Sequence, residues 1–244
     1  MGVLDAWTEG EHTGDGRTFP TYRRGSGPGV VVVHEIPGLT PQVVAFAEEV
    51  VEAGYTVVLP HLFGMPGARV NPLTLANAVR QVCVSREFTK LATGETTPVA
   101  GWLRSLAREL HAELGGPGVG ALGMCFTGGF ALAMMVDDAV AAPVVAQPSA
   151  PFAIGGRRAA DLNLSPADLA TVRERAAGGC PVLGLRYAQD PAVGSRFETL
   201  TDELGEAFIR VEFPGRRHAT LTLHRQQEAV DRVLAFFAER LGGA

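Results

Sequence analysis

The amino-acid sequence predicts an α/β fold with a mostly parallel central sheet and helices on both faces. Short runs rich in valine alternate with longer stretches of helical period, which is typical of repeated βαβ units. The valine runs are apolar at nearly every position, as expected for strands that are buried on both faces. The chain has 244 residues, of which 46% are hydrophobic. That is enough for one sizeable core, so we expect a single domain over residues 1–244.

Six apolar runs are predicted strands, and a turn follows each of them. They cover residues 30–34, 56–59, 119–122, 143–146, 182–185 and 207–213. Parallel strands place their carboxyl ends along one edge of a sheet, where open α/β folds have their ligand crevice. The loops after these strands are therefore the first places to look for functional residues.

Three longer segments are predicted helices. Residues 42–53 and 98–114 are each followed by a glycine, and the second has Thr97 as its N-cap and Pro98 at its first position. The last helix covers residues 225–241, and its apolar residues at helical spacing indicate a face that packs on the core.

Two segments fit this alternation poorly. The apolar pattern is weak in residues 63–96, and a stretch rich in Gly, Arg and Ala occupies residues 149–179. Both follow strand carboxyl ends, so we expect loops with short helices that border the pocket. This interpretation is favoured over a second domain.

The charge balance argues against nucleic acid as a partner, because the net charge is −5, the pI is near 5.7 and the basic residues are scattered. The N-terminus is polar and acidic, without the apolar run of a secretory signal, and no apolar stretch approaches the roughly 18 residues of a membrane helix. We therefore expect a cytoplasmic protein that does not bind membranes. Its expected partner is a small-molecule substrate, and the chain is expected to be a monomer or a homodimer.

No cofactor and no metal is expected. The three cysteines are widely spaced and form no CxxC pair, and the histidines lack HExxH spacing. The glycine-rich stretches form neither GxGxxG nor a P-loop after a strand. Side chains of the chain itself should therefore carry the chemistry.

The segment VGALGMCFTGGFALAMM gives the strongest local signal for a reactive group. A strand of small and apolar residues runs through Gly123 to Cys125 and then into a helical apolar pattern. This pattern is typical of a nucleophile elbow, a sharp turn that needs small neighbours and holds the nucleophile at a helix N-terminus. That position also favours the thiolate form of a cysteine. The alternative is a small buried cysteine whose glycines only let strand and helix pack closely.

The order of residues along the chain supports the elbow. An α/β hydrolase needs a nucleophile, then an acid, then a base, each in a loop after a strand. Asp190 follows the fifth predicted strand and His218 follows the sixth. Alone, Asp190 could be a turn residue and His218 a surface histidine, but together with Cys125 they predict a catalytic triad. His224 is a rival base, although it is predicted to begin the last helix.

On these residues the chain resembles the dienelactone hydrolase (carboxymethylenebutenolidase) family, which has the α/β-hydrolase fold. The resemblance extends from about residue 29 to the C-terminal helix. The segments that carry it are VVVHEIPGL, GMCFTGGF, and LGLRYAQDPAV with the later His218. It implies an eight-stranded, mostly parallel sheet and hydrolysis of a lactone or ester through an acyl-cysteine intermediate.

The resemblance also implies a fourth functional residue, Glu35, which in the family is thought to help generate the thiolate when substrate arrives. The alternative is a glutamate paired with an arginine at a strand end. A buried carboxylate without a partner is costly, so a partner is expected under either interpretation.

The chain departs from the family pattern at three places. The family's elbow reads GxCxGG, whereas Thr127 occupies the first of those glycine positions, and the family's PDLF appears as PHLF, with His61. Enzymes that take dienelactones are expected to carry an arginine shortly after the catalytic histidine, but this chain reads HATLTLH. The basic residues of other loops, which we expect to be solvated surface charges rather than anion ligands, are Arg86, Lys90, Arg157, Arg158 and Arg186. The actual ester or lactone is therefore left open.

These residues lead to one hypothesis for the mechanism. Cys125 would attack the acyl carbon while the backbone N–H groups of Ile36 and Phe126 hold the oxyanion. His218, oriented by Asp190, would take the thiol proton, pass it to the leaving alkoxide or enolate, and later activate water. Two alternatives use the same fold: a broader carboxylesterase or thioesterase, and a catalytically silent hydrolase-fold binding protein.

Overall fold

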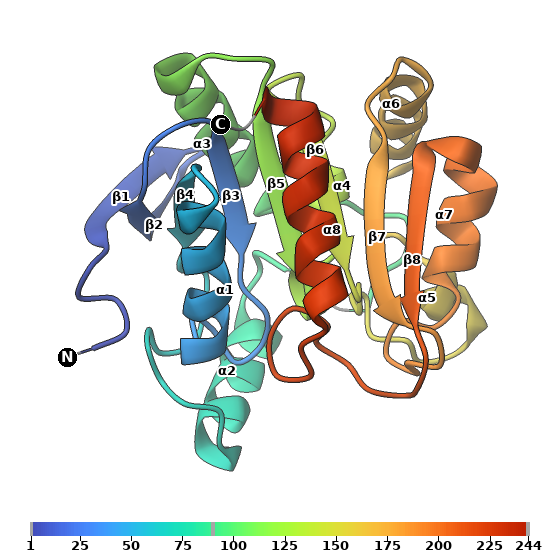
Figure 1. The fold of residues 1–244 in the computed structure, drawn as a ribbon. Coiled ribbons are helices and arrows are strands. Elements are labelled where there is room, and N and C mark those ends of the chain that lie inside the picture. Colours follow the sequence, from blue (N-terminus) through green and yellow to red (C-terminus); the bar gives the residue numbers. More distant parts are fainter. Residues whose placement is uncertain (1, 89–90, 243–244) are drawn as a thin grey trace.

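One sheet forms the centre of the fold (Figure 1). Within residues 2–88 and 91–242, which the computed structural model describes, the sheet has eight strands. They are β1 (Thr8–Gly14), β2 (Arg17–Arg24), β3 (Gly29–Val33), β4 (Thr56–Pro60), β5 (Val119–Met124), β6 (Val140–Ala146), β7 (Val182–Tyr187) and β8 (Phe208–Phe213). Their spatial order is β1-β2-β4-β3-β5-β6-β7-β8. The strands β3 to β8 are parallel to one another, whereas β2 runs antiparallel to both β1 and β4.

The predicted α/β fold and all six predicted strands are confirmed, with ends that differ by a few residues. Every residue of β3 and β4 is buried, as the continuous apolar runs indicated. Helices cover both faces of the sheet, and this explains why these strands lack an alternation of polar and apolar residues.

The N-terminal hairpin of β1 and β2 was not predicted. Asp15 and Gly16 connect the two strands, and both have a positive φ, 51° and 72°. Such a two-residue turn is typical of a tight β-hairpin, and the Asp-Gly pair is its sequence signal. The surrounding residues are mostly polar and few of them are buried, so they lack the apolar runs by which the other strands were found.

The helices lie on the two faces of the sheet, and Figure 1 shows α1 and α8 together in front of it. They pack on one core cluster, and a second cluster lies on the opposite face with α3 and α4. The helices are α1 (Pro41–Glu52), α2 (Pro72–Val84), α3 (Ala100–Leu114), α4 (Phe130–Met134), α5 (Gly156–Ala160), α6 (Pro166–Ala177), α7 (Arg196–Leu204) and α8 (Gln227–Phe237). Single turns are η1 (Cys125–Thr127), η2 (Gly205–Ala207) and η3 (Ala238–Gly242).

Three predicted helices are present, but two of them begin later than expected. Helix α3 starts at Ala100, because the Thr97 hydroxyl donates to the Glu87 carbonyl at 2.9 Å instead of capping the helix. Helix α8 starts at Gln227, so His224 lies in the preceding turn and does not begin the helix. Among the described residues, no helix has the length and apolar character that crossing a membrane requires.

The two segments that fitted poorly contain full-length helices as well as loops. Helix α2 has 13 residues and α6 has 12, so the expectation of short helices alone was wrong. Only Ala78 and Val82 of α2 are buried, and this explains why its apolar pattern is weak. The side chain of Asn71 caps α2 by accepting from the backbone N–H groups of Leu73 and Thr74.

Candidate active site

Cys125 lies at the apex of a sharp turn between β5 and α4. Its φ is +56°, a left-handed conformation that is rare for a residue with a side chain and common at functional sites. A Cβ at Gly123 would lie 2.1 Å from the Thr127 carbonyl oxygen, and one at Gly128 would lie 2.6 Å from Pro148 Cα. The turn therefore requires glycine at both positions, as a nucleophile elbow does.

Thr127 replaces an elbow glycine of the family pattern, and its side chain is fully buried. Its hydroxyl group contacts the main chain at the ends of β3 and β5. Its hydroxyl oxygen lies 3.1 Å from the carbonyl oxygens of Val33 and His34, at the end of β3. It also lies 3.0 Å from the Met124 carbonyl oxygen and accepts from the Met124 N–H at 3.2 Å. The hydroxyl thus links the elbow to the chain that leads into Glu35.

Asp190 and His218, predicted from separate loops, are in direct contact. Asp190 follows β7 and His218 follows β8, and their Oδ2 and Nδ1 atoms are 2.5 Å apart. The second carboxylate oxygen of Asp190 accepts from the Ala192 N–H at 3.0 Å, and the residue is 5% exposed. These contacts hold the carboxylate in one orientation toward the imidazole ring.

The His218 ring also lies close enough to Cys125 for that side chain to affect its pKa. Burial lowers the pKa of His218, but the hydrogen bond to Asp190 and the proximity of Cys125 outweigh burial and raise the pKa to about 10. The ring is therefore an imidazolium at neutral pH. The Cys125 Sγ lies 3.5 Å from the Ser149 hydroxyl, a contact that the sequence did not indicate.

Glu35 is the fourth predicted residue, and it lies at the same edge of the sheet. The side chain is buried, and its partner is the Thr222 hydroxyl rather than an arginine. Burial raises the pKa of Glu35, whereas the bond from Thr222 and the charge of His218 act in the opposite direction. Glu35 therefore favours its protonated form more strongly than an exposed glutamate does.

Gln147, at the end of β6, is a buried neighbour of Glu35 that sequence reasoning missed. Its Oε1 accepts from the Thr220 N–H at 3.2 Å and from the Thr220 hydroxyl at 2.7 Å. Its Nε2 is buried and has no hydrogen-bond partner among the described residues. A positive φ of 35° marks the position as conformationally strained. This strain could not be detected in the sequence.

The side chain of His34 forms hydrogen bonds with the main chain next to Glu35. Its Nε2 accepts from the Leu62 N–H at 3.1 Å, and its Nδ1 lies 3.1 Å from the Glu35 carbonyl oxygen. Complete burial lowers the pKa of His34 to about 3, so the ring is neutral. Burial also lowers the pKa of His61, the residue that departs from the family's PDLF.

Ile36 and Phe126, the predicted oxyanion donors, follow neighbouring strands. Val33 of β3 pairs with Gly123 of β5, and each predicted donor lies three residues beyond that pair. The Phe126 ring is fully buried, and both residues pack on the same core cluster. The register thus brings the two backbone segments to the same part of the sheet edge, while their role stays a prediction.

The rival base His224 contacts the main chain of His218. Its Nδ1 lies 2.7 Å from the His218 carbonyl oxygen, and its own N–H donates to the Ala219 carbonyl at 3.1 Å. This ring nitrogen therefore helps to shape the loop that presents His218.

The basic residues of other loops differ from one another in their surroundings. Arg86 and Arg157 are exposed and Arg158 is half-buried, whereas Lys90 lies outside the described residues. Arg186 is 5% exposed, so the expectation of a solvated charge was wrong there. It pairs with Glu198 and Glu212 at 2.7 and 2.6 Å, which compensates the charge on burial.

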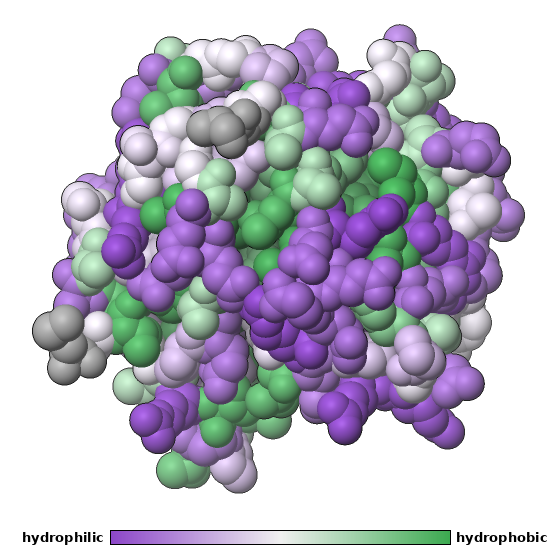
Figure 2. Space-filling model, in the orientation of Figure 1, coloured by the Kyte–Doolittle hydropathy of each residue, from purple (hydrophilic) through white to green (hydrophobic). Residues whose placement is uncertain are grey.

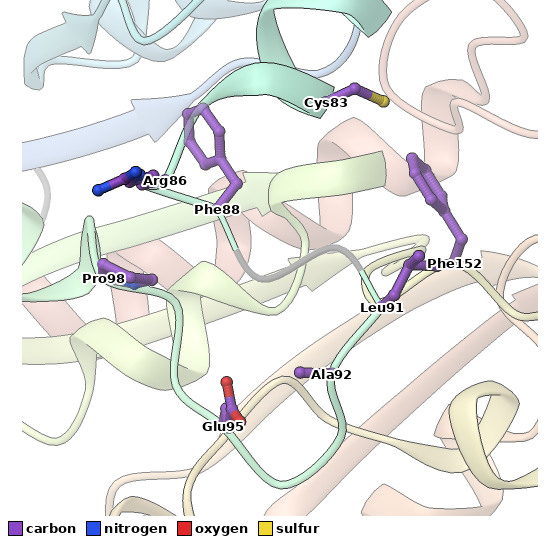
Figure 3. Close-up of a pocket in the computed structure, with 8 residues that line it drawn as sticks. All are labelled: Cys83, Arg86, Phe88, Leu91, Ala92, Glu95, Pro98 and Phe152. Carbon is purple, nitrogen blue, oxygen red and sulfur yellow. The ribbon is translucent and has the colours of Figure 1, made fainter.

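A cavity of about 610 Å³ lies beside the aromatic rings that pack on Phe126, and Figure 3 draws the residues that line it. Two of its lining residues, Phe88 and Phe152, pack against the Phe126 ring, with centroids 5.6 and 5.9 Å away. The lining comprises Cys83, Arg86, Phe88, Leu91, Ala92, Glu95, Pro98 and Phe152. Its volume lies within the range of ligand pockets.

Comparison with known proteins identifies relatives of this chain. The model of the dienelactone hydrolase family matches residues 18–239. No significant match was found among curated proteins.

Solved structures share the fold at low sequence identity. A dienelactone hydrolase from Anabaena variabilis is 16% identical, with 97% of this chain and 99% of that chain covered and a TM-score of 0.66. A cold-adapted esterase from an Arctic intertidal metagenomic library is 19% identical, with coverages of 97% and 95% and a TM-score of 0.64. A dienelactone hydrolase-like promiscuous phosphotriesterase from metagenomic libraries is 17% identical, with coverages of 97% and 98% and a TM-score of 0.62.

Proposed function

The chain belongs to the dienelactone hydrolase family, and we propose that it hydrolyses a small lactone or ester through an acyl-cysteine intermediate. One observation carries the proposal: His218 bonds to Asp190 and lies near enough to Cys125 for that side chain to affect the ring. The three side chains come from the ends of β8, β7 and β5, and only the fold brings them together. This is the arrangement of base, acid and nucleophile that acyl transfer requires.

In the first half of the proposed reaction, the Cys125 thiolate, whose proton is held by His218, attacks the acyl carbon of the substrate. The backbone N–H groups of Ile36 and Phe126 hold the oxygen that becomes negative. The bond between the acyl carbon and the leaving oxygen then breaks, and that oxygen takes the proton from His218. The raised pKa of His218 supports this step, because the proton that the leaving group needs is already on the ring at neutral pH.

In the second half, water hydrolyses the acyl-enzyme. His218, now neutral, takes a proton from water, and the hydroxide attacks the thioester carbon. The bond between carbon and sulfur breaks, the acid departs, and the thiolate of Cys125 faces the imidazolium again. Asp190 keeps the ring in one orientation through both halves.

Glu35 assists as a buried carboxyl group beside the pair. It lies close enough to His218 for its charge to affect the ring, and the Thr222 hydroxyl donates to it. In the family, the corresponding glutamate is thought to help generate the thiolate when substrate arrives. Burial raises the pKa of Glu35, so its carboxyl group keeps a proton to higher pH than an exposed glutamate does.

A cysteine nucleophile favours substrates with good leaving groups, such as enol esters, strained lactones, aryl esters or thioesters. A panel of these compounds, assayed with the wild type and with Cys125→Ala, tests the proposed function. We expect hydrolysis of at least one class by the wild type and a loss of at least 10³-fold in the variant.

The same panel separates the alternatives. Turnover of simple aryl esters and thioesters but not of enol lactones would identify a broader esterase or thioesterase. Inactivity of the wild type on every compound would favour a binding protein with the hydrolase fold. Unchanged hydrolysis by Cys125→Ala would overturn the role of the cysteine.

A further inference from the structure

We propose that the cavity beside Phe126 binds the acyl part of the substrate, and that this part is an uncharged apolar or aromatic group. The inference rests on the proposed function. It adds a substrate class and a binding site to it.

The lining of the cavity is predominantly apolar. Phe88 and Phe152 stand on opposite sides of it, and Leu91 lies next to Phe152 (Figure 3). Ala92 and Pro98 complete the apolar part of the wall. Binding an apolar acyl group in this lining is favourable because hydrocarbon is removed from water. Binding a carboxylate there is unfavourable because the carboxylate loses its hydration.

The two charged residues of the lining do not form an anion site. Figure 3 shows the Arg86 side chain extending away from the other lining residues. The second charge belongs to Glu95, an exposed carboxylate that repels an anionic substrate. The cavity therefore differs from the carboxylate site that a dienelactone would need.

The surface around the cavity is apolar as well. Val84, Leu91 and Ile154 are 74%, 49% and 64% exposed, and Figure 2 shows apolar side chains at the lower edge of the molecule, where α2 lies. A smaller hollow of about 360 Å³, lined in part by Ile154, shares Leu91 and Ala92 with the cavity. Because Arg157 and Arg158 also line this second hollow, the apolar preference is assigned to the first cavity alone.

The position of the cavity assigns it to the acyl group rather than to the leaving group. Phe88, Phe126 and Phe152 pack on the core cluster on the α3 side of the sheet. The segment after His218 packs Leu221 on the opposite cluster, with α1 and α8. Because the leaving group takes its proton from His218, it departs on that side, and the acyl group points toward Phe126.

The test compares p-nitrophenyl esters that share one leaving group. For the wild type, kcat/KM should rise about fourfold for each methylene added from acetyl through butanoyl to hexanoyl, as expected when each group is buried. The p-nitrophenyl monoester of succinic acid matches the butanoyl ester in length but ends in a carboxylate, and it should react at least tenfold more slowly.

Two variants, each with one alanine replaced by tryptophan, test whether the preference for long acyl groups arises in the cavity. Ala92→Trp fills the cavity, so the ratio of kcat/KM for hexanoyl to acetyl esters should fall at least tenfold. Ala76→Trp places the same ring on the exposed surface of α2, outside the lining, and should leave the ratio unchanged.

The outcomes distinguish this inference from the proposed function. Hydrolysis that depends on Cys125 but is equally fast for all acyl groups would overturn the inference alone, as would faster reaction of the succinate monoester. An unchanged ratio in Ala92→Trp would also overturn it. Hydrolysis that survives Cys125→Ala would instead overturn the proposed function.

Discussion

The Thr222 hydroxyl donates a hydrogen bond to the buried carboxyl group of Glu35. Thr222 lies four residues after His218 on the same loop. The contact lies in the stretch where enzymes that take dienelactones are expected to carry an arginine. A neutral hydroxyl cannot neutralise a carboxylate, so burial dominates and raises the pKa of Glu35. Glu35 is therefore fixed in place by a group that permits it to stay protonated.

Glu35→Gln should change how stability depends on pH. The pKa of Glu35 in the folded protein is raised above 4.5, so the folded state keeps a proton that the unfolded state releases. Its contribution to stability is complete below pH 4.5 and is lost as pH rises through the folded-state pKa. The free energy of unfolding of the variant, relative to the wild type, should therefore increase as the pH is raised.

Urea unfolding of both proteins at a series of pH values checks this prediction. Glu52→Gln, at an exposed position of α1, is the matched control and should show no such trend. A difference between Glu35→Gln and the wild type that does not vary with pH would contradict the raised pKa.

Asp190→Asn should lower both the pKa of His218 and the activity. Without the carboxylate, burial prevails and the pKa of His218 should fall from about 10 toward or below its ordinary value of 6.5. The proton for the leaving group would then be lost at lower pH, and kcat/KM should fall by about 10²–10⁴-fold. Titration of the His218 ring by NMR measures the first effect. Asp202→Asn, at an exposed position, should leave both quantities unchanged, and a His218 pKa that stays near 10 in Asp190→Asn would refute this account.

Thr127→Val should loosen the link between the elbow and β3. The substitution keeps the shape of the side chain but removes the hydroxyl that contacts the carbonyl groups of Val33, His34 and Met124. We expect a loss of about 1–3 kcal/mol in the free energy of unfolding, because buried polar groups lose a partner. Thr127→Ser retains the hydroxyl and should keep most of this stability. Equal stability of the Val and Ser variants in urea unfolding would show that the hydroxyl is unimportant.

Arg196→Met should destabilise the loops around the acid. Arg196 is fully buried, and burial lowers its pKa to about 10. Its guanidinium donates to the carbonyl groups of Pro151, Arg158, Asp161, Ala192 and Val193. We expect a loss of about 3 kcal/mol or more, whereas Arg173→Met, which breaks an exposed pair with Glu203, should cost less than about 1 kcal/mol. Similar losses for the two variants in urea unfolding would argue against this role of Arg196.

The sequence was most informative where one local pattern determines the structure. The apolar runs identified all six strands from β3 to β8, because burial on both faces leaves no alternation to obscure them. The glycines around Cys125 indicated the elbow, since a side chain at Gly123 or Gly128 would collide with the backbone. The chain order of Cys125, Asp190 and His218 predicted a triad, and the fold brings Asp190 and His218 into contact.

The sequence was least informative where a contact depends on distant segments. Thr222 reaches Glu35 from the loop after β8, and no spacing along the chain signals this. Arg186 looked like a surface charge because its partners, Glu198 and Glu212, belong to other elements. The β1–β2 hairpin did have a local signal, the Asp15–Gly16 pair, but its polar strands hid it.

The central claim is that Cys125 carries the acyl group during turnover, and a mass measurement tests it most directly. A p-nitrophenyl ester is mixed with the enzyme, the reaction is stopped with acid within the first turnover, and the peptides are analysed by mass spectrometry. The account predicts one added acyl group on the peptide that contains Cys125, and none on the peptides that contain Cys83 or Cys180. Release of p-nitrophenol with the acyl group absent from Cys125, or found on another residue, would contradict it.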